Sequence, residues 1–457
     1  MKSKTTLKIS ISGARGVVGD SLTPQLAAAL AQAFGTYVGG GPVLIGRDTR
    51  RSGIMLAEAV AAGLAATGCQ TVDVGVCAIP SFLYLTKHQR AAGGIAVTAS
   101  HNPKPWNGLK FISRDGLYLT PRQTEEYLDI YHQGEFALAG PERYRAPARL
   151  EDASEPHLRR ILSRFDTSIV RRCKLRVALD CNNGAGSLLG PRLLEAFGCE
   201  VVPLYTDPAG DFAHDSEPLP ENISDVCRAV REYKADIGFV QDADADRLAV
   251  VNERGEPLGE ELTMGLAVRH VLAKRRGSIV CNLSSSRLID DLAAERGCRV
   301  FRTRIGEINV VEKLLAARPR AVLGGEGNGG VIDPLVHPCR DSFTAMALIL
   351  EYMAESRRKI SALQAALPRY VMIKDRMAGS AEQAHRLIGR LRKLYEPKGR
   401  VDLTDGLKVD FPDAWIHVRP SNTEPIIRVL AEARTQAKAE TALTALKGAI
   451  AASLEKT

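Results

Sequence analysis

The stretch LRVALDCNNGAGSLLGPRLLEAFG (175–198) contains one complete folding unit of this chain. LRVALD (175–180) is an apolar run with the length of a buried strand, NGAG (183–186) is a turn sequence, and the residues that follow have helical spacing. Comparable units start at PVLIG (42–46) and at GSIVCNL (277–283). Alternating strands and helices favour sheets covered by helices on both faces, so the sequence predicts three doubly wound α/β domains.

The C-terminal part of the chain has a different pattern. Three strand-like runs, LKVDF, AWIHVRP and PIIRVLAEA, precede a closing helix with Leu443, Leu446 and Ile450 on one face. This order predicts an α+β module. We therefore expect mixed α/β domains at 1–148, 149–255 and 256–367 and an α+β domain at 368–457, arranged around a central cleft.

The composition is that of a folded globular protein. Of the 457 residues, 45% are hydrophobic and 25% are charged, which excludes a disordered chain, a coiled coil and a disulfide-stabilised miniprotein. No apolar run reaches the ~18 residues of a membrane span, and the N-terminus lacks the apolar core of a signal peptide. We therefore expect a cytoplasmic protein that has no membrane partner.

The charge balance suggests an anionic partner. Lysine and arginine number 61 against 53 acidic residues, which gives a net charge of +8. The basic residues are scattered along the chain, and aromatic residues, which stack on bases, make up only 5%. A small phosphorylated molecule is therefore a better candidate partner than a nucleic acid.

The strongest chemical signal is DADADR (242–247), which lies between the apolar runs IGFV and LAVV. Alternate residues of extended chain point to one face, so Asp242, Asp244 and Asp246 converge. Three neighbouring carboxylates repel one another, and a divalent cation, with magnesium the best match to hard oxygen ligands, relieves this repulsion. A calcium-binding EF-hand is one alternative, but Arg247 stands where that loop needs glycine. A solvated acidic turn is the other, and the apolar flanks argue against it.

A second signal is TASHNP (98–103), which follows the strand-like run GGIAV and precedes WNGLK (106–110). Ser100, at a strand end beside His101, is placed to be an exposed nucleophile. A Ser–His–Asp hydrolase is an alternative, although no GxSxG motif surrounds Ser100. A capping or turn serine is the purely structural alternative.

Two further segments suit a sugar phosphate. GGEGNGG (324–330) combines glycines, which allow close backbone approach, with Glu326 and Asn328, a natural pair for sugar hydroxyls. RPSNTEPIIR (419–428) offers arginines, hydroxyls and backbone amides, which suit phosphate. Taken alone, each segment is equally compatible with an ordinary turn.

TASHNP, DADADR, GEGNGG and RPSNTEP occur in this order, one in each predicted domain. The set resembles the four active-site motifs of the α-D-phosphohexomutase superfamily, which includes phosphoglucomutase, phosphomannomutase and phosphoglucosamine mutase. SGARG (12–16) and GRDTRRSG (46–53) resemble that family's N-terminal signatures, so the resemblance covers essentially the whole chain. It implies an intramolecular phosphotransferase that interconverts hexose 1-phosphate and hexose 6-phosphate, with glucosamine, mannose or glucose phosphate as the substrate.

The resemblance also implies roles for individual residues. Ser100 matches the phosphoserine that donates and regains the phosphoryl group, and the proposed ligands of Mg²⁺ are Ser100, Asp242, Asp244 and Asp246. The residues that match the surroundings of the transferring group are Arg15, His101, Lys110 and Arg247. Those that match the sugar-binding and phosphate-binding loops are Gly306, Glu307, Glu326, Asn328, Arg419, Ser421, Asn422, Thr423 and Arg428.

In the implied cycle, the sugar phosphate accepts the phosphoryl group, becomes a hexose 1,6-bisphosphate, and turns over before it returns a phosphoryl group to serine. Phosphoryl transfer depends mainly on positioning of the reacting groups and on fixed positive charge that stabilises the transition state. The chain departs from the family's usual pattern at Ala243, where glycine is more frequent, and at Gly330, where many members carry a histidine considered for acid–base catalysis. Lys110 and His101 then remain as candidates for proton transfer.

Two other functions are compatible with parts of this pattern. A magnesium-dependent sugar-phosphate phosphatase of the haloacid dehalogenase type would use an aspartate of the acidic cluster as its nucleophile. A non-catalytic binder of sugar phosphates or nucleic acid would explain the positive charge but has no need of Ser100 beside a metal cluster. We expect a monomer or a homodimer.

Overall fold

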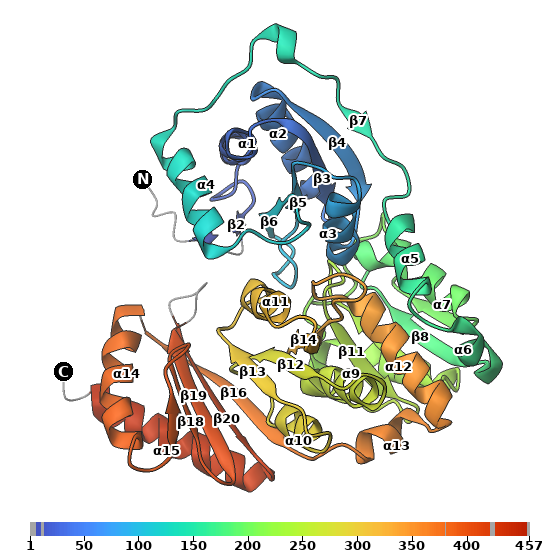
Figure 1. Ribbon diagram of the computed structural model, residues 1–457, viewed down its shortest axis with the longest axis vertical. Coiled ribbons are helices and arrows are strands. Elements are labelled where there is room, and N and C mark those ends of the chain that lie inside the picture. Colours follow the sequence, from blue (N-terminus) through green and yellow to red (C-terminus); the bar gives the residue numbers. More distant parts are fainter. Residues whose placement is uncertain (1–5, 11–12, 380, 421–425, 455–457) are drawn as a thin grey trace. The chain divides into compact units, whose positions relative to one another are not determined.

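The computed structural model describes residues 6–10, 13–379, 381–420 and 426–454 (Figure 1). The chain divides into two compact units. The first consists of Met1–His270 and Asn328–Gln364, and the second of Val271–Gly327 and Ala365–Thr457. Among the helices of the described residues, none is both long and apolar enough to cross a membrane.

A mixed sheet at the start of the first unit carries the serine motif. In the described residues its strand order is β1–β2–β6–β5–β3–β4–β7. β3 is parallel to β4 and β5, whereas β6 is antiparallel to β5 and β2. The strands are β1 (Lys8–Ser10), β2 (Gly13–Val17), β3 (Gly41–Arg47), β4 (Cys69–Val76), β5 (Gly93–Val97), β6 (Trp106–Ser113) and β7 (Ala148–Arg149). The TASHNP motif therefore lies in the connection between two adjacent inner strands.

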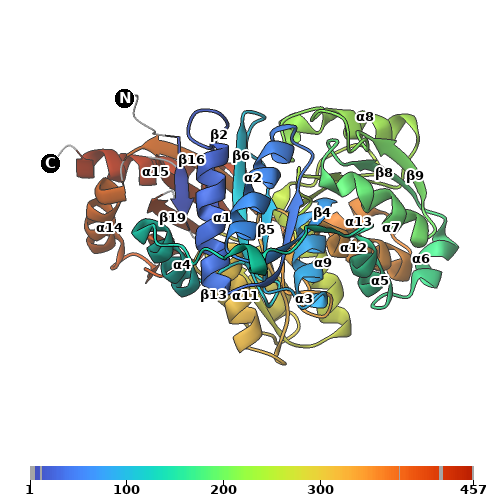
Figure 2. The same cartoon turned by 90° about the horizontal axis from the view of Figure 1, so that it is seen from above.

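Helices cover both faces of this sheet because its central strands are apolar on both sides. Val43 and Ile45 of β3 share a core with α1, α2 and α4, whereas Leu44, between them, packs in a second core with α3. The helices are α1 (Pro24–Val38), α2 (Ser52–Ala66), α3 (Ile79–His88) and α4 (Pro121–Gln133). In Figure 2, α1 and α2 lie side by side over the sheet.

The strand predicted at 175–180 is β8, at the centre of a second sheet in the first unit. The strand order is β11–β10–β8–β9, parallel except for β11. The strands are β8 (Arg176–Asp180), β9 (Glu200–Leu204), β10 (Ile237–Gln241) and β11 (Leu248–Asn252). The other elements of the first unit and of its connection to the second are α5 (Glu155–Leu162), α6 (Thr167–Cys173), α7 (Gly190–Ala196), α8 (Ser224–Glu232), α9 (Glu260–Lys274), β15 (Gly330–Ile332), α12 (Ser342–Ser356) and α13 (Ile360–Ala365).

The helical stretch that follows the NGAG turn is divided in the structure. A short 3₁₀ helix (Ala185–Leu188) comes first, and α7 begins at Gly190. Pro191 explains the division, because proline lacks an N–H group and fits only in the first turn of a helix.

The second unit contains two sheets. The parallel strands are ordered β13–β12–β14, and the antiparallel strands are ordered β16–β20–β19–β18–β17. The elements are β12 (Ser278–Asn282), α10 (Leu288–Ala294), β13 (Val300–Thr303), α11 (Glu307–Ala316), β14 (Ala321–Glu326), β16 (Val371–Ala378), α14 (Ala381–Tyr395), β17 (Arg400–Asp402), β18 (Leu407–Asp410), β19 (Ala414–Pro420), β20 (Ile426–Ala433) and α15 (Gln436–Leu454). Leu443, Leu446 and Ile450 of α15 pack into the core of the antiparallel sheet, as their spacing predicts. This mixed α/β architecture confirms the predicted fold class, while the central cleft and the domain boundaries stay predictions.

Candidate active site

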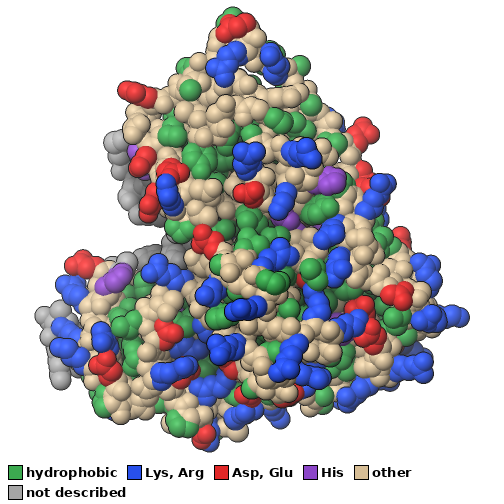
Figure 3. Space-filling view, viewed as in Figure 1, with side chains coloured by type: hydrophobic (Ala, Val, Ile, Leu, Met, Phe, Trp, Pro, Cys, Tyr) green, Lys and Arg blue, Asp and Glu red, His purple; other side chains and the backbone are tan. Residues whose placement is uncertain are grey.

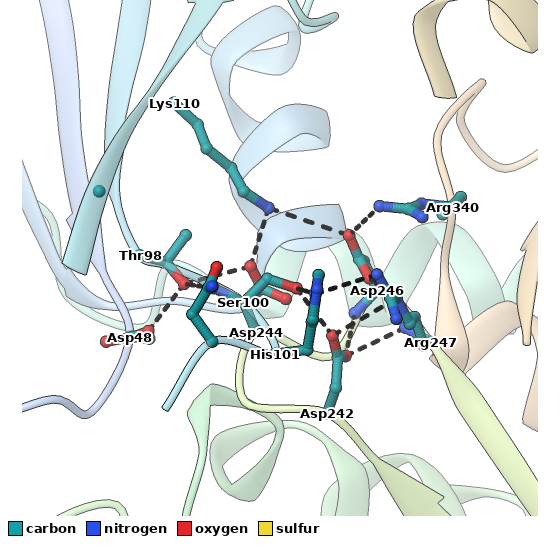
Figure 4. Close-up of polar contacts among 12 residues, drawn as sticks. Asp48, Thr98, Ser100, His101, Lys110, Asp242, Asp244, Asp246, Arg247 and Arg340 are labelled. Atoms are coloured by element: carbon teal, nitrogen blue, oxygen red, sulfur yellow. Dashed lines mark hydrogen bonds and ion pairs between the residues drawn. The ribbon is translucent and has the colours of Figure 1, made fainter. Parts of the chain in front are cut away.

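Ser100 lies in a tight turn directly after β5. Its φ of 49° is in the left-handed region, which is unfavourable for a residue with a side chain. The turn is held because the N–H group of Ser100 donates to Oγ1 of Thr98 at 3.0 Å. Ser100 is buried, and its hydroxyl donates to Oδ2 of Asp242 at 3.0 Å (Figure 4). The structure thus places the candidate nucleophile in contact with the acidic motif.

The acidic motif is the connection between β10 and β11, which pair up to Gln241 and Leu248. The three aspartate side chains of the motif are fully buried. Oδ1 of Asp242 accepts the N–H groups of Asp246 and Arg247, each at 3.1 Å, so this carboxylate also closes the turn. The predicted loop between two strands is therefore present, and it is buried instead of solvated.

Backbone hydrogen bonds from three other segments fix the acidic loop. The carbonyl oxygens of residues 243, 244 and 245 accept from the N–H of Ala185 (2.8 Å), the N–H of Ile79 (2.9 Å) and the hydroxyl of Ser342 (2.6 Å), respectively. Gly184 permits this close approach, because a Cβ atom at that position would lie 2.6 Å from the carbonyl oxygen of Ala243. The positions of the carboxylates are consequently set by the fold of the whole first unit.

The acidic cluster fits a divalent cation. One oxygen from each of Asp242, Asp244 and Asp246 lies within 4.8 Å of the other two. In the part of the chain that the structure describes, Oδ1 of Asp244 and Oδ1 of Asp246 are buried and have no hydrogen-bond partner. A buried carboxylate oxygen without a partner is unfavourable unless a cation binds it. Three hard oxygen donors at this spacing suit Mg²⁺.

Cationic side chains surround the carboxylates. Nζ of Lys110 lies 2.8 Å from Oδ2 of Asp244, and Nη2 of Arg340 lies 2.6 Å from Oδ2 of Asp246. Burial and the neighbouring carboxylates raise the pKa of Asp242 well above its usual value. Burial also acts to raise the pKa of Asp244, but Lys110 and Arg15 outweigh it and hold this pKa at about 2.

Arg340 was not predicted from the sequence, because it lies outside all four motifs. It follows GGEGNGG by ten residues, in HPCRDS, and only its contact with Asp246 assigns it to the site. Arg15, which was predicted, lies beside the serine turn and donates to Oδ1 of Asn102 at 3.1 Å.

His101 contacts the cluster through Arg247. Nη2 of Arg247 lies 3.0 Å from Nδ1 of His101, and because arginine is only a donor, the imidazole accepts at Nδ1 and carries its hydrogen on Nε2. The charge of Arg247, followed by burial, lowers the pKa of His101 well below its usual value. The ring is therefore neutral at neutral pH.

Arg50 and Asp48 are further site residues to which the sequence analysis gave no role. The guanidinium of Arg50 donates to the backbone carbonyls of Ser100 (2.8 Å), Asn102 (2.7 Å), Pro103 (2.9 Å) and Trp106 (3.1 Å). Asp48 holds the Nε of Arg50 at 3.1 Å and accepts the hydroxyl of Thr98 at 2.7 Å. Both lie in GRDTRRSG (46–53), just after β3, and both are buried, which the sequence itself does not indicate.

The remaining predicted residues are divided between the units. In the second unit, Oε1 of Glu326 accepts from the N–H of Gly306 (3.0 Å) and from Nδ2 of Asn282 (2.8 Å), and Glu307 begins α11. Arg419 and Arg428 are register partners on β19 and β20, and burial lowers the pKa of Arg419. Asn328 belongs to the first unit, where its Oδ1 accepts the N–H of Gly330 at 3.3 Å. Ser421, Asn422 and Thr423 lie outside the described residues.

Comparison with known protein families gives a match along the whole chain. Residues 7–138, 155–255 and 260–370 match the phosphoglucomutase/phosphomannomutase alpha/beta/alpha domains I, II and III, and residues 372–447 match the C-terminal domain of the same family. The four matches follow one another in the order that the family's domains have.

Individual relatives agree with this match. The chain is 37% identical to a protein of Methanopyrus kandleri named probable phosphoglucosamine mutase, over 94% of each chain. It is 36% identical to a phosphoglucomutase/phosphomannomutase of Thermococcus kodakarensis, over 93% of this chain and 94% of the relative. A crystal structure of a phosphoglucomutase/phosphomannomutase family protein from Burkholderia thailandensis superposes with a TM-score of 0.85 at 29% identity, over 99% of this chain and 98% of the other. The chain belongs to the phosphoglucomutase/phosphomannomutase family of phosphohexomutases, and it is an enzyme, an intramolecular phosphotransferase.

Proposed function

We propose that this enzyme interconverts hexose 1-phosphate and hexose 6-phosphate through a phosphoserine at Ser100 and a hexose 1,6-bisphosphate intermediate. The observation that carries the proposal is the 3.0 Å contact between the hydroxyl of Ser100 and Asp242, inside a buried cluster of carboxylates and cations. A serine that only capped a turn would need neither the strained φ of 49° nor this charged surrounding. A nucleophile that accepts and returns a phosphoryl group needs both positioning and fixed charge.

Mg²⁺ is the cofactor that we propose for the acidic cluster. Asp242, Asp244 and Asp246 would hold it together with the side-chain oxygen of Ser100. Bound there, the ion would supply Lewis-acid charge neutralisation at the phosphoryl group. The support is the spacing of the three oxygens and the two buried Oδ1 atoms, of Asp244 and Asp246, that lack a hydrogen-bond partner among the described residues.

The cationic side chains would stabilise the charge of the group in transfer. Lys110 and Arg247 contact the carboxylates, and Arg15 is held beside the serine turn, so their charges are in place before a substrate binds. Of the two candidates for proton transfer, His101 is the less suitable, because Arg247 donates to its Nδ1 atom and lowers its pKa. We therefore assign proton transfer to Lys110, and to His101 the orientation of Arg247.

The predicted binding residues would hold the rest of the substrate. We propose that Gly306, Glu307, Glu326 and Asn328 contact the sugar, and that Arg419 and Arg428, with Ser421, Asn422 and Thr423, hold the phosphate that is not reacting. Glucosamine, mannose and glucose phosphates are all candidate substrates, since the named relatives include both a phosphoglucosamine mutase and a phosphoglucomutase/phosphomannomutase. The cytoplasmic location and the monomeric or dimeric state stay predictions.

The alternative functions find less support. A phosphatase with an aspartate nucleophile needs a carboxylate oxygen that attacks phosphorus, whereas Asp242 closes its own turn and the Oδ1 atoms of Asp244 and Asp246 are the ones that we propose to bind the metal. Lysine and arginine are interspersed with acidic and apolar side chains on the face drawn in Figure 3, which favours a small anion over a nucleic acid.

The test is a direct assay with three substrates. The enzyme, Mg²⁺ and a trace of hexose 1,6-bisphosphate are incubated with glucosamine, mannose or glucose 1-phosphate, and ³¹P NMR follows the products. We expect a hexose 6-phosphate from at least one substrate, no turnover by Ser100→Ala, and normal turnover by the control Ser163→Ala on the exposed end of α5. Release of inorganic phosphate without a 6-phosphate would indicate a phosphatase, and no conversion of any substrate would contradict the proposal.

A further inference from the structure

Gly330, at the start of β15, leaves a space that the side chain of Arg340 occupies. A Cβ atom at position 330 would lie 2.3 Å from Cδ and 2.9 Å from Cγ of Arg340. The φ of Gly330 is outside the left-handed region, so its backbone conformation is open to other residues. Glycine at this position therefore gives room to the side chain of Arg340, and its conformational freedom is not used.

The side chain that uses this space ends at the acidic cluster. Nη2 of Arg340 lies 2.6 Å from Oδ2 of Asp246, and only 11% of the Arg340 side chain is exposed (Figure 4). Oδ1 of the same aspartate is the buried oxygen that lacks a hydrogen-bond partner among the described residues. Arg340 thus engages one oxygen of Asp246 and leaves the other available to a cation.

Arg340 also adds positive charge to the cluster. Its guanidinium acts electrostatically on His101, Asp244 and Arg247. With Arg15, Lys110 and Arg247, it makes four cationic side chains around the three aspartates, and Glu217, 3.2 Å from Arg247, is a fourth carboxylate beside them. Because arginine keeps its proton, Arg340 contributes charge and orientation and does not transfer a proton.

We propose that Gly330 and Arg340 act as a pair, in which the missing side chain at 330 lets Arg340 orient Asp246 toward the metal and add charge beside the transferring phosphoryl group. Arg340 is then a positioning residue of the reaction, acting through Asp246. The proposal rests on the proposed function for its catalytic part, while its metal-binding part is measured without turnover.

The test is a double-mutant cycle with Gly330→Ala, Arg340→Ala and the double variant. The readouts are kcat, KM and the affinity for Mn²⁺, a spectroscopic probe for the Mg²⁺ site, measured by electron paramagnetic resonance on protein without substrate. Loss of Asp246 orientation should outweigh the relief of repulsion between Arg340 and the cation, so we expect each single variant to weaken Mn²⁺ binding by about 10-fold, the lower end of the range for residues that orient metal ligands. Each should also lower kcat more than it raises KM. In the Arg340→Ala background, Gly330→Ala should change Mn²⁺ binding by less than about 2-fold, because Gly330 acts on the metal site only through the side chain of Arg340.

Three controls separate orientation from folding. Gly389→Ala in α14, where a Cβ atom meets nothing within 4 Å, and Arg122→Ala on the exposed face of α4 should leave every readout unchanged. Arg340→Lys should recover part of the Mn²⁺ affinity, because an ammonium can contact Asp246 at one point.

The outcomes distinguish the pair from simpler explanations. Independent effects of Gly330→Ala and Arg340→Ala, or unchanged Mn²⁺ affinity in Arg340→Ala, would overturn the proposal. If Gly330→Ala does not fold, recovery of folding in the double variant supports the pair, and failure of both variants to fold contradicts it. Absence of mutase activity in the unmodified enzyme would end the proposed function, yet coupled Mn²⁺ binding would still support the pair.

Discussion

The acidic cluster of the first unit and the proposed binding residues of the second unit differ in how their charged side chains are paired. In the first unit, Lys110, Arg247 and Arg340 each lie within 4.0 Å of a buried carboxylate. Lys110 is in strand β6, and hydrogen bonds fix the loop that carries Arg247. In the second unit, Glu326 is held by neutral donors, while Arg419 and Arg428 stand opposite each other on neighbouring strands. Two like charges side by side favour an anion between them.

In the proposed function, the first set of residues serves the chemical step and the second set serves substrate binding. Charges that are already arranged lower the barrier to phosphoryl transfer, because nothing has to reorganise in the transition state. A pair of arginines that binds a phosphate away from the reacting atoms contributes to binding in the ground state and the transition state alike. Substitutions in the first unit should therefore lower kcat, and substitutions in the second unit should raise KM.

The largest effect is expected for Lys110→Met. The substitution removes the ammonium 2.8 Å from Asp244 and leaves a buried carboxylate without its partner, so kcat should fall by about 1000-fold. Steady-state kinetics measures this, with Lys447→Met in the exposed ion pair with Asp375 as the control. A change in KM with unchanged kcat would contradict the expectation that substitutions in the first unit lower kcat.

A smaller loss is expected for Arg50→Lys. One ammonium cannot reach the four carbonyls that the guanidinium of Arg50 contacts, so the serine turn should loosen and kcat should fall by about 10- to 100-fold. The control is Arg51→Lys at the neighbouring, exposed position, which should remain fully active. Equal activity of the two variants would mean that the turn does not depend on the clamp.

Arg419→Ala tests the expectation that substitutions in the second unit raise KM. If this residue holds the phosphate that is not reacting, its loss should raise KM by about 10-fold and leave kcat within about 3-fold of the unmodified enzyme. Arg400→Ala, in an exposed ion pair with Asp410 on the same sheet, is the matched control. A fall in kcat without a change in KM would place Arg419 with the chemistry and not with recognition.

The smallest effect concerns stability and pH at His417 in β19. Its Nε2 donates to the carbonyl of Asp405 at 2.6 Å and its Nδ1 accepts from Ser284 at 2.9 Å, so the buried ring is satisfied when neutral, and burial lowers its pKa from 6.5 to about 3. Between these two values the unfolded chain takes up a proton that the folded protein does not. The free energy of unfolding should therefore fall as the pH falls from 6.5 toward 3, by up to about 1.4 kcal/mol per pH unit.

Urea unfolding at pH 7 and pH 5 measures this dependence. His417→Gln removes the titrating group and should flatten the loss of stability on acidification, while the exposed His132→Gln on α4 should not. An equally steep loss in His417→Gln would assign the acid sensitivity to other groups.

The sequence predicted what depends on local pattern. The apolar runs indicated the strands on either side of DADADR, and the close spacing of its three aspartates indicated their cluster, because both features are properties of neighbouring residues. The aspartates meet in a turn with Ala245 at a φ of 58°, and not on one face of an extended chain as predicted. The division of the helical stretch after NGAG was harder to predict, although Pro191 indicates where α7 begins. The fold class was therefore predictable, and element boundaries less so.

Contacts between distant segments were not predictable in this way. Arg50 contacts a loop that starts fifty residues later, and Arg340 reaches Asp246 across ninety-four residues, and nothing in the spacing of either arginine indicates its partner. The resemblance to phosphohexomutases proposed residues for the reaction, but the contacts that Arg50 and Arg340 make with them emerged only from the fold. The neutral state of His101 likewise follows from Arg247, a residue that only the tertiary structure brings to it.

The central claim is that the side-chain oxygen of Ser100 carries the phosphoryl group. The most direct measurement is mass spectrometry of peptides from the enzyme after incubation with hexose 1,6-bisphosphate and Mg²⁺. We predict an acid-stable addition of about 80 Da on the peptide with Ser100, which hexose 1-phosphate removes and which Ser100→Ala lacks. An addition found only on Asp242, Asp244 or Asp246, and labile to hydroxylamine, would contradict the account.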